Sequence, residues 1–265
     1  METNQFFSLK RFYLLLRNDS LINYKMYLYT TISAFMGGLV FLYMLMPKGY
    51  YHTNYDNTIY QTSFLFCLVG MAIFYGMSFP DMDNKIKARS YLMLPSSTFE
   101  KFLSQFLIRM VVGSILFMLI FWIDTRISRL AILAIYKVAD PTKIDIFHFA
   151  SLYTPTNTLI TNAAVTFCII SIGTFIFSVR LYFKKNSLVK TAISTIAVLY
   201  LIGCFMVLFS HIFYPSTIGF YVHSNGHSTI YPTINSFDIW FYSVMYLSWL
   251  FLLPLGYYKL KEKQV

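Results

Sequence analysis

Residues 91–107 read YLMLPSSTFEKFLSQFL and mark the start of a helix between two long apolar segments. Pro95 disfavours the α conformation at Leu94, so a preceding helix should end there. Ser97 and Glu100 fit the S-x-x-E capping box, in which each residue accepts a hydrogen bond from the backbone amide of the other. Apolar residues then recur at three- and four-residue spacing, at Phe99, Phe102, Leu103, Phe106, Leu107 and Met110. The stretch therefore predicts a structured loop followed by a long helix that begins near Ser97.

The composition around this stretch is that of a membrane protein. Hydrophobic residues make up 57% of the chain and charged residues 12%, whereas a soluble domain has about 25% charged residues. Six runs approach or exceed the roughly 20 residues that a helix needs to cross a bilayer. The charged residues in these runs are Arg109 and, at one edge, Asp238. We expect an all-α polytopic membrane protein with a single transmembrane domain over 1–265 and spans at about 27–46, 61–79, 102–123, 157–179, 191–213 and 237–257.

The first 26 residues differ from a cleavable signal peptide, which has a short apolar core and a small-residue cleavage site. In residues 1–26 large apolar side chains alternate with the basic residues Lys10, Arg11 and Arg17. Such a pattern is typical of an amphipathic helix that lies in the membrane interface. The simpler alternative is a cytosolic lead-in to the first span.

The basic residues predict the orientation of the chain. With six spans, one side of the membrane holds 16 of the 21 Lys and Arg residues, and the bias recurs in every loop on that side. Basic residues concentrate on the cytoplasmic side of membrane proteins, so both termini are expected in the cytosol. This topology also accounts for the net charge of +10 without a nucleic-acid partner, and membrane lipids surround the spans.

The loop between spans two and three, residues 80–101, is then cytosolic. Asp83 or Asn84 can cap a short helix in it, with Ile86, Tyr91 and Leu92 as apolar contacts and the basic residues exposed. A helix held parallel to the membrane in this way offers a docking surface for a cytosolic partner. The residues that we expect to contact it are Asp83, Lys85, Lys87, Arg89, Tyr91, Ser97, Glu100 and Lys101.

Six spans, an interfacial N-terminal helix and this cytosolic coupling loop resemble the ABC-2 type transporter permeases, the membrane subunits of ABC exporters. Residues 78–107 are similar to a segment of a Bacteroidetes group of these permeases, in which an LPAS-like sequence is followed by EK and a leucine-rich helix. The matching positions here are Leu94, Pro95, Ser96 or Ser97, Glu100, Lys101 and Leu103.

The resemblance implies a location in the bacterial cytoplasmic (inner) membrane and a partnership with ABC ATP-binding subunits. Those subunits would bind ATP and Mg, and this chain would need no cofactor of its own. It would form a homodimer or pair with a sister permease, with the loop as the coupling element. The resemblance also implies short helices in the outer loop 214–236, where Asn225-Gly226 instead predicts a hairpin turn.

The sequence lacks the motifs of several enzyme classes, so we expect no catalytic site in this chain. The phosphate-binding G-x-x-x-x-G-K-[ST], the zinc-binding H-E-x-x-H and the G-x-S-x-G of hydrolases are absent. Asp81 and Asp83 form a D-x-D pair, for which capping of the loop helix is the simpler explanation. His223 and His227 are four residues apart, a ligand spacing that works on a helix, but a turn is predicted between them and no third ligand is evident, so no metal site is expected. The alternative to a permease is an ATPase-independent scaffold of an envelope complex or an intramembrane enzyme.

Two further expectations concern the third span. Arg109 lies about three helical turns from Ser97, so its side chain should snorkel to the cytosolic interface. The alternative is a contact with the coupling loop or with the partner. Beyond the span, apolar and basic residues at near-helical spacing predict that the helix continues outward and stops before Pro141.

Overall fold

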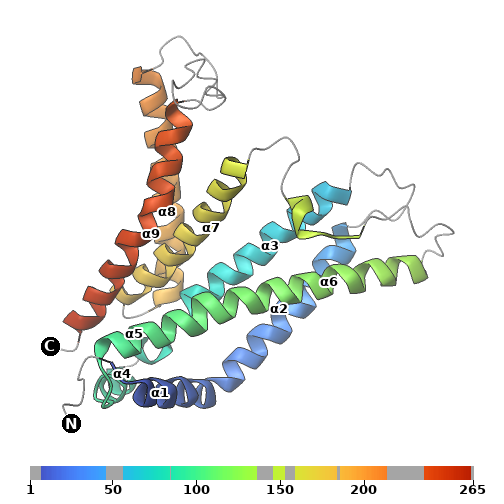
Figure 1. Ribbon diagram of the computed structural model, residues 1–265. Helices are drawn as coiled ribbons and strands as arrows, with labels where there is room; N and C mark the ends of the chain where they lie inside the picture. Colours follow the sequence, from blue (N-terminus) through green and yellow to red (C-terminus); the bar gives the residue numbers. More distant parts are fainter. Residues whose placement is uncertain are drawn as a thin grey trace. The chain divides into compact units, whose positions relative to one another are not determined.

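The computed structural model describes residues 7–45, 56–83, 85–135, 146–152, 159–183, 186–213 and 236–263. These residues form helices and connecting turns, and no strand occurs among them (Figure 1). The α-helices are α1 (Leu9–Ile22), α2 (Tyr24–Leu45), α3 (Asp56–Gly76), α4 (Lys85–Leu92), α5 (Thr98–Phe106), α6 (Gly113–Ile135), α7 (Leu159–Val179), α8 (Ser187–Phe213) and α9 (Ser236–Glu262). The other helical segments are η2 (Pro80–Asp83), the π-helical η3 (Leu107–Val112), η5 (Phe149–Leu152) and η6 (Arg180–Tyr182).

The helices group into two compact units. The first contains residues 1–80 and 89–158, and the second contains residues 81–88 and 159–265. The boundary falls inside α4. The organisation of 1–265 as a single transmembrane domain stays a prediction.

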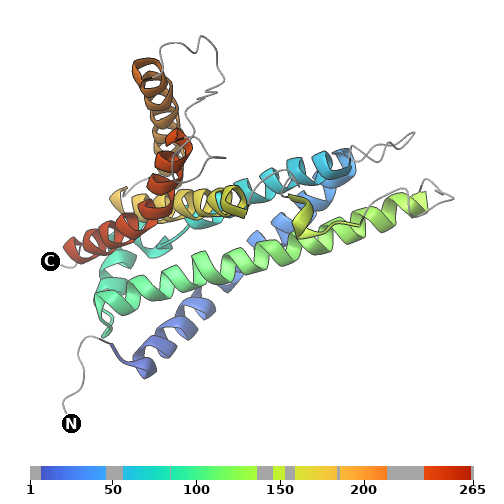
Figure 2. The same cartoon turned by 45° about the horizontal axis from the view of Figure 1, so that its top comes forward.

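In the first unit, α5, η3 and α6 follow one another as a continuous helix from Thr98 to Ile135 (Figure 1). We call this segment the long helix. Helices α2 and α3 pack against its α6 part, and α1 lies beside its first turns in both views (Figures 1 and 2). The predicted helix start at Ser97 is therefore confirmed, and so is the continuation of the third span beyond residue 123.

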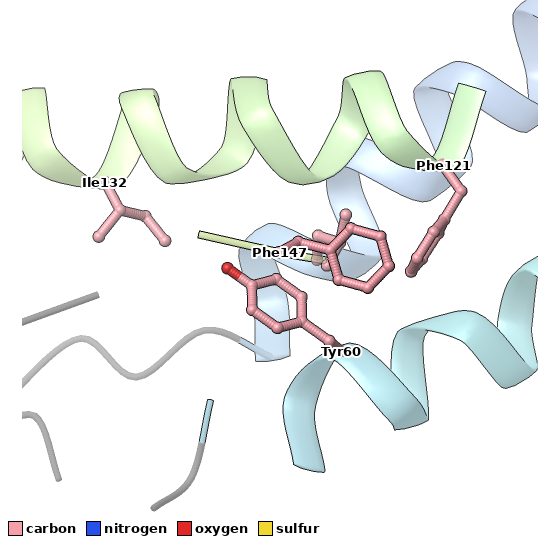
Figure 3. Packing of buried hydrophobic residues seen from close by; sticks show 5 residues of the cluster. Tyr60, Phe121, Ile132 and Phe147 are labelled. Carbon is pink, nitrogen blue, oxygen red and sulfur yellow. The ribbon is translucent and has the colours of Figure 1, made fainter. Parts of the chain in front are cut away.

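An aromatic cluster holds this unit together at the far end of the long helix. Figure 3 shows Tyr60, Phe121, Ile132 and Phe147 converging on one another, and Leu42 completes the cluster. The Phe121 and Phe147 rings meet edge to face with centroids 5.2 Å apart. The cluster thereby joins α2, α3 and α6 to the segment that precedes η5.

The second unit is built on α7 and α9, which pack along each other, with α8 beside α7. Two polar contacts join α7 and α9. The Ser248 hydroxyl donates to the Ser171 hydroxyl at 2.7 Å, and the Ser178 hydroxyl donates to the Leu252 carbonyl at 2.8 Å. Small hydroxyl residues of this kind allow apolar helices to approach closely and to hydrogen-bond across their interface.

Four helical stretches among the described residues are long and apolar enough to cross a membrane. They are Tyr24–Leu45, Ile59–Gly76, Thr98–Ile135 and Ser187–Phe205. Their outer faces are apolar as well: one row along α2 consists of Leu28, Ile32, Met36 and Val40, each about half exposed. In water such rows would be unfavourable, whereas lipid tails would cover them. The fold is thus that of a multi-pass helical membrane protein.

Helices α7 and α9 coincide with the predicted fourth and sixth spans. Whether they cross the membrane, and hence the count of six spans, stays a prediction. Helix α1 occupies the expected position in residues 1–26, and its placement in the membrane interface stays a prediction too. The outer-loop hairpin at Asn225-Gly226, with His223 and His227, lies outside the described residues.

Candidate functional site

The candidate site is the loop that leads into the long helix, together with α1 beside it. It begins where α3 ends, at Phe79, whose φ of 52° is in the left-handed region. A phenylalanine rarely adopts this conformation, so its surroundings must hold it. The Phe79 amide donates to Gln105 Oε1 at 3.3 Å, and its ring packs against Phe102 of α5. The chain thus turns sharply from α3 into η2 and α4.

The capping box at the start of the long helix is confirmed in both halves. The Glu100 amide donates to Ser97 Oγ at 3.1 Å, and the Ser97 amide donates to Glu100 Oε2 at 2.9 Å. The negative carboxylate also lies in the first turn, where the helix dipole favours it.

Glu100 has a second function that the capping motif does not predict: it fixes α1 to the long helix. Its side chain is fully buried, and its Oε1 atom accepts hydrogen bonds from the Ser8 amide at 2.7 Å and from the Arg11 guanidinium at 3.2 Å. Hydrogen bonds that involve a charged group contribute about 1.5–3 kcal/mol each. One carboxylate thus joins the loop, α1 and α5.

Lys101 fixes the end of α4 to the same helix. Its ammonium group donates to the Leu92 carbonyl at 2.8 Å and lies 5.9 Å from the centroid of the Tyr91 ring. Only 1% of Lys101 is exposed, and Tyr91 is buried. These contacts fix the last turn of α4 against α5, so the loop is a structured element.

One turn further along α5, a buried polar chain connects α1, α2 and the end of α3. Asp19 of α1 accepts hydrogen bonds from Asn23 at 3.0 Å, from the Tyr27 hydroxyl at 2.6 Å and from Gln105 Nε2 at 2.9 Å. Gln105 in turn accepts the Phe79 amide. Sequence reasoning missed Asp19 and Gln105. Their partners lie up to 86 residues away, so no local pattern could reveal them.

Arg109 corrects the expectation of snorkelling. The side chain is fully buried, and its guanidinium lies 4.8 Å from the ring centroids of both Tyr27 and Phe74. Desolvated cation–π contacts of this kind are worth about 2 kcal/mol. Arg109 also lies in the π-helical segment η3, a distortion that is frequent at functional sites. It therefore links the long helix to α2 and α3, and its guanidinium is not exposed to solvent.

The predicted contact residues consequently separate into two groups. Lys87 and Arg89 are exposed on α4, as expected. Ile86, expected to make an apolar contact, is 76% exposed, so that expectation is wrong. Tyr91, Glu100 and Lys101 are buried and hold the loop from inside, and Ser97 is half-buried in the capping box. The side chains of Asp83 and Lys85 lie outside the described part of the structure, as does Asn84.

No group of three or more His, Cys, Asp or Glu side chains in the described ranges could hold a metal ion. The printed contacts attach a basic surface helix and an N-terminal helix to the long helix. Comparison of the chain with models of protein families, with curated proteins and with solved structures found no match. The resemblance to ABC-2 type permeases therefore stays a prediction.

Proposed function

We propose that this chain is the membrane-spanning permease subunit of an ATP-driven ABC exporter. In this proposal it crosses the bacterial cytoplasmic membrane six times, with both termini in the cytosol, as a homodimer or beside a sister permease. A separate ABC ATP-binding subunit holds ATP and Mg and docks on α4 and α1. The observation that supports the proposal best is the attachment of α1 and the loop to the first turns of the long helix through buried Glu100.

The long helix is long enough to transmit a displacement from the surface elements at its start into the membrane. It contains 38 residues, which corresponds to about 57 Å at 1.5 Å per residue. The hydrocarbon core of a bilayer is only about 30 Å thick, so the helix extends beyond it. Because Glu100, Lys101 and Gln105 fix the surface elements at its start, a displacement of α1 or of the loop would move the helix inside the membrane.

The exposed face of α4 has the chemistry of a docking surface. Lys87 and Arg89 are exposed beside the apolar Ile86. A large apolar side chain flanked by basic groups suits a groove with an acidic rim, because opposite charges steer association. This chain contributes no nucleotide site to the proposed complex.

Co-purification tests the proposal. The tagged wild-type chain, expressed with its ATP-binding subunit, should retain that subunit and stimulate ATP hydrolysis. Simultaneous reversal of Lys85, Lys87 and Arg89 to Glu should weaken both, while membrane insertion stays intact. The matched control reverses Lys259, Lys261 and Lys263 at the C-terminus, which changes the net charge equally and should leave both readouts unchanged.

Two results would contradict the proposal. Unchanged binding and ATPase stimulation in the α4 variant would make the loop a simple connector. Absence of any ATP-binding subunit from the purified wild-type chain would favour the ATPase-independent scaffold or the intramembrane enzyme.

A further inference from the structure

A cavity of about 410 Å³ lies between α2, α3 and α6 of the first unit and is partly open at its surface, where Tyr29, Val69 and Ile73 are exposed. Its volume is in the range of sites for small organic ligands. Five aromatic residues contribute to its wall, namely Tyr29, Phe41, Phe66, Phe117 and Phe121. Phe121 and Leu42 also belong to the aromatic cluster of Figure 3, so this cluster adjoins the cavity.

Asp124 of α6 lines this cavity and is the acidic residue among its described lining residues. The residue is only 1% exposed. Among the described residues, its Oδ1 atom accepts no hydrogen bond. The other carboxylate oxygen lies against Gly38 of α2, where a Cβ atom would collide with it. Glycine at position 38 therefore leaves the space that the carboxylate occupies.

The other lining residues offer Asp124 little compensation. The described lining includes no Lys, Arg or His. The hydroxyl of Thr30 donates to the Met26 carbonyl at 2.7 Å, and that of Ser63 donates to the Ile59 carbonyl at 2.8 Å, each within its own helix. An uncompensated buried carboxylate costs several kcal/mol, on the order of 3–5. Ionisable groups within membrane-spanning helices are rare and tend to mark substrate or ion pathways.

We propose that this cavity binds a small amphipathic organic cation, whose charge pairs with the Asp124 carboxylate and whose apolar body contacts the aromatic rings. Aromatic faces attract organic cations, and the single acidic group among the described lining residues determines the sign of the ligand's charge. The inference goes beyond the proposed function, because binding requires no ATP-binding partner. It therefore holds or fails independently of the co-purification experiment.

The first test uses the unaltered full-length chain in a non-ionic detergent and titration calorimetry. The probes are benzylammonium, whose N–H groups can donate to the carboxylate, its neutral isostere ethylbenzene, and phenylacetate as an anion of similar size. The cation should bind at least about tenfold more tightly than the neutral isostere, because a charge-assisted contact is worth about 1.5–3 kcal/mol. The anion should not bind. Equal affinity for the cation and its isostere, or no binding of the cation, would overturn the proposal.

The second test removes the charge. Asp124→Asn preserves the shape of the side chain and should weaken cation binding at least about tenfold, without a change in binding of the neutral isostere. The matched control is Glu262→Gln, which removes one negative charge from the exposed end of α9 and should bind the cation as the wild type does. If Asp124→Asn binds the cation with the affinity of the wild type, the carboxylate is not needed and the proposal is overturned. The cavity would then be an apolar surface of the kind that a lipid chain or a helix of a second copy covers.

Discussion

The long helix has two buried carboxylates, Glu100 in its first turn and Asp124 in its second half, and the two have opposite surroundings. Glu100 accepts hydrogen bonds from two backbone amides and from the Arg11 guanidinium. Asp124, which is almost as deeply buried, has an Oδ1 atom without a donor among the described residues. Burial alone therefore does not distinguish them, and the presence or absence of partners does.

This difference separates a structural role from a binding role. Buried polar groups in folded proteins are nearly always hydrogen-bonded, so an exception calls for an explanation. Glu100 meets the rule and stabilises the attachment of α1 and the loop. Asp124 departs from it and lies in the wall of a cavity, which leaves room for a ligand to supply the missing partner.

The largest effect is expected from Glu100→Ala. It leaves the Ser8 and Ser97 amides without their acceptor in a partly buried position, which costs about 3 kcal/mol. The apparent midpoint of thermal unfolding in detergent should fall by about 6–12 °C, and limited proteolysis should cut the chain near Arg17. A midpoint within about 1 °C of the wild type would show that Glu100 is not the residue that holds α1.

The middle of the long helix offers a second, smaller test. A Cβ atom at Gly113 would lie 2.5 Å from Cε1 of Phe74, the ring that contacts Arg109. Gly113→Ala should therefore cost about 1–3 kcal/mol through overpacking. The matched control is Gly203→Ala in α8, where nothing lies within 4 Å of the added atom and helix propensity predicts a gain of up to about 1 kcal/mol. Equal thermal midpoints for the two variants would contradict the packing described around Arg109.

The smallest effect is expected from Ser97→Ala. This change removes the hydroxyl that accepts the Glu100 amide, but it preserves the Ser97 amide that donates to the carboxylate. Loss of such a cap costs about 1 kcal/mol, so the thermal midpoint should fall by about 2–4 °C. A loss as large as that of Glu100→Ala would indicate that the cap, and not the contact with α1, dominates the energetics at this end of the helix.

The sequence predicted well what depends on local patterns. The capping box needs residues only three apart, and the start of the long helix follows from it. The apolar runs predicted the helices, because a membrane span needs about 20 uncharged residues in succession. The continuation of α6 to Ile135 followed from its apolar spacing in the same way.

Side-chain partners across the chain were not predictable from such patterns. Glu100 contacts Ser8, 92 residues earlier, and Arg109 lies between Tyr27 and Phe74 because three helices meet there. Asp124 follows directly after the predicted third span, so in the sequence it resembled an ordinary boundary residue. Its importance depends on the approach of Gly38 from α2, which only the packing of the helices reveals.

The most direct test of this contrast is the thermal stability of Glu100→Gln and Asp124→Asn, measured side by side without ligand in one detergent. Each change replaces a buried carboxylate by a neutral amide of the same shape. We expect a clearly lower midpoint for Glu100→Gln, which loses a charged acceptor, and an equal or higher midpoint for Asp124→Asn, which loses an uncompensated buried charge. A fall in Asp124→Asn as large as that in Glu100→Gln would contradict the contrast between the two carboxylates, because Asp124 would then hold the fold as Glu100 does.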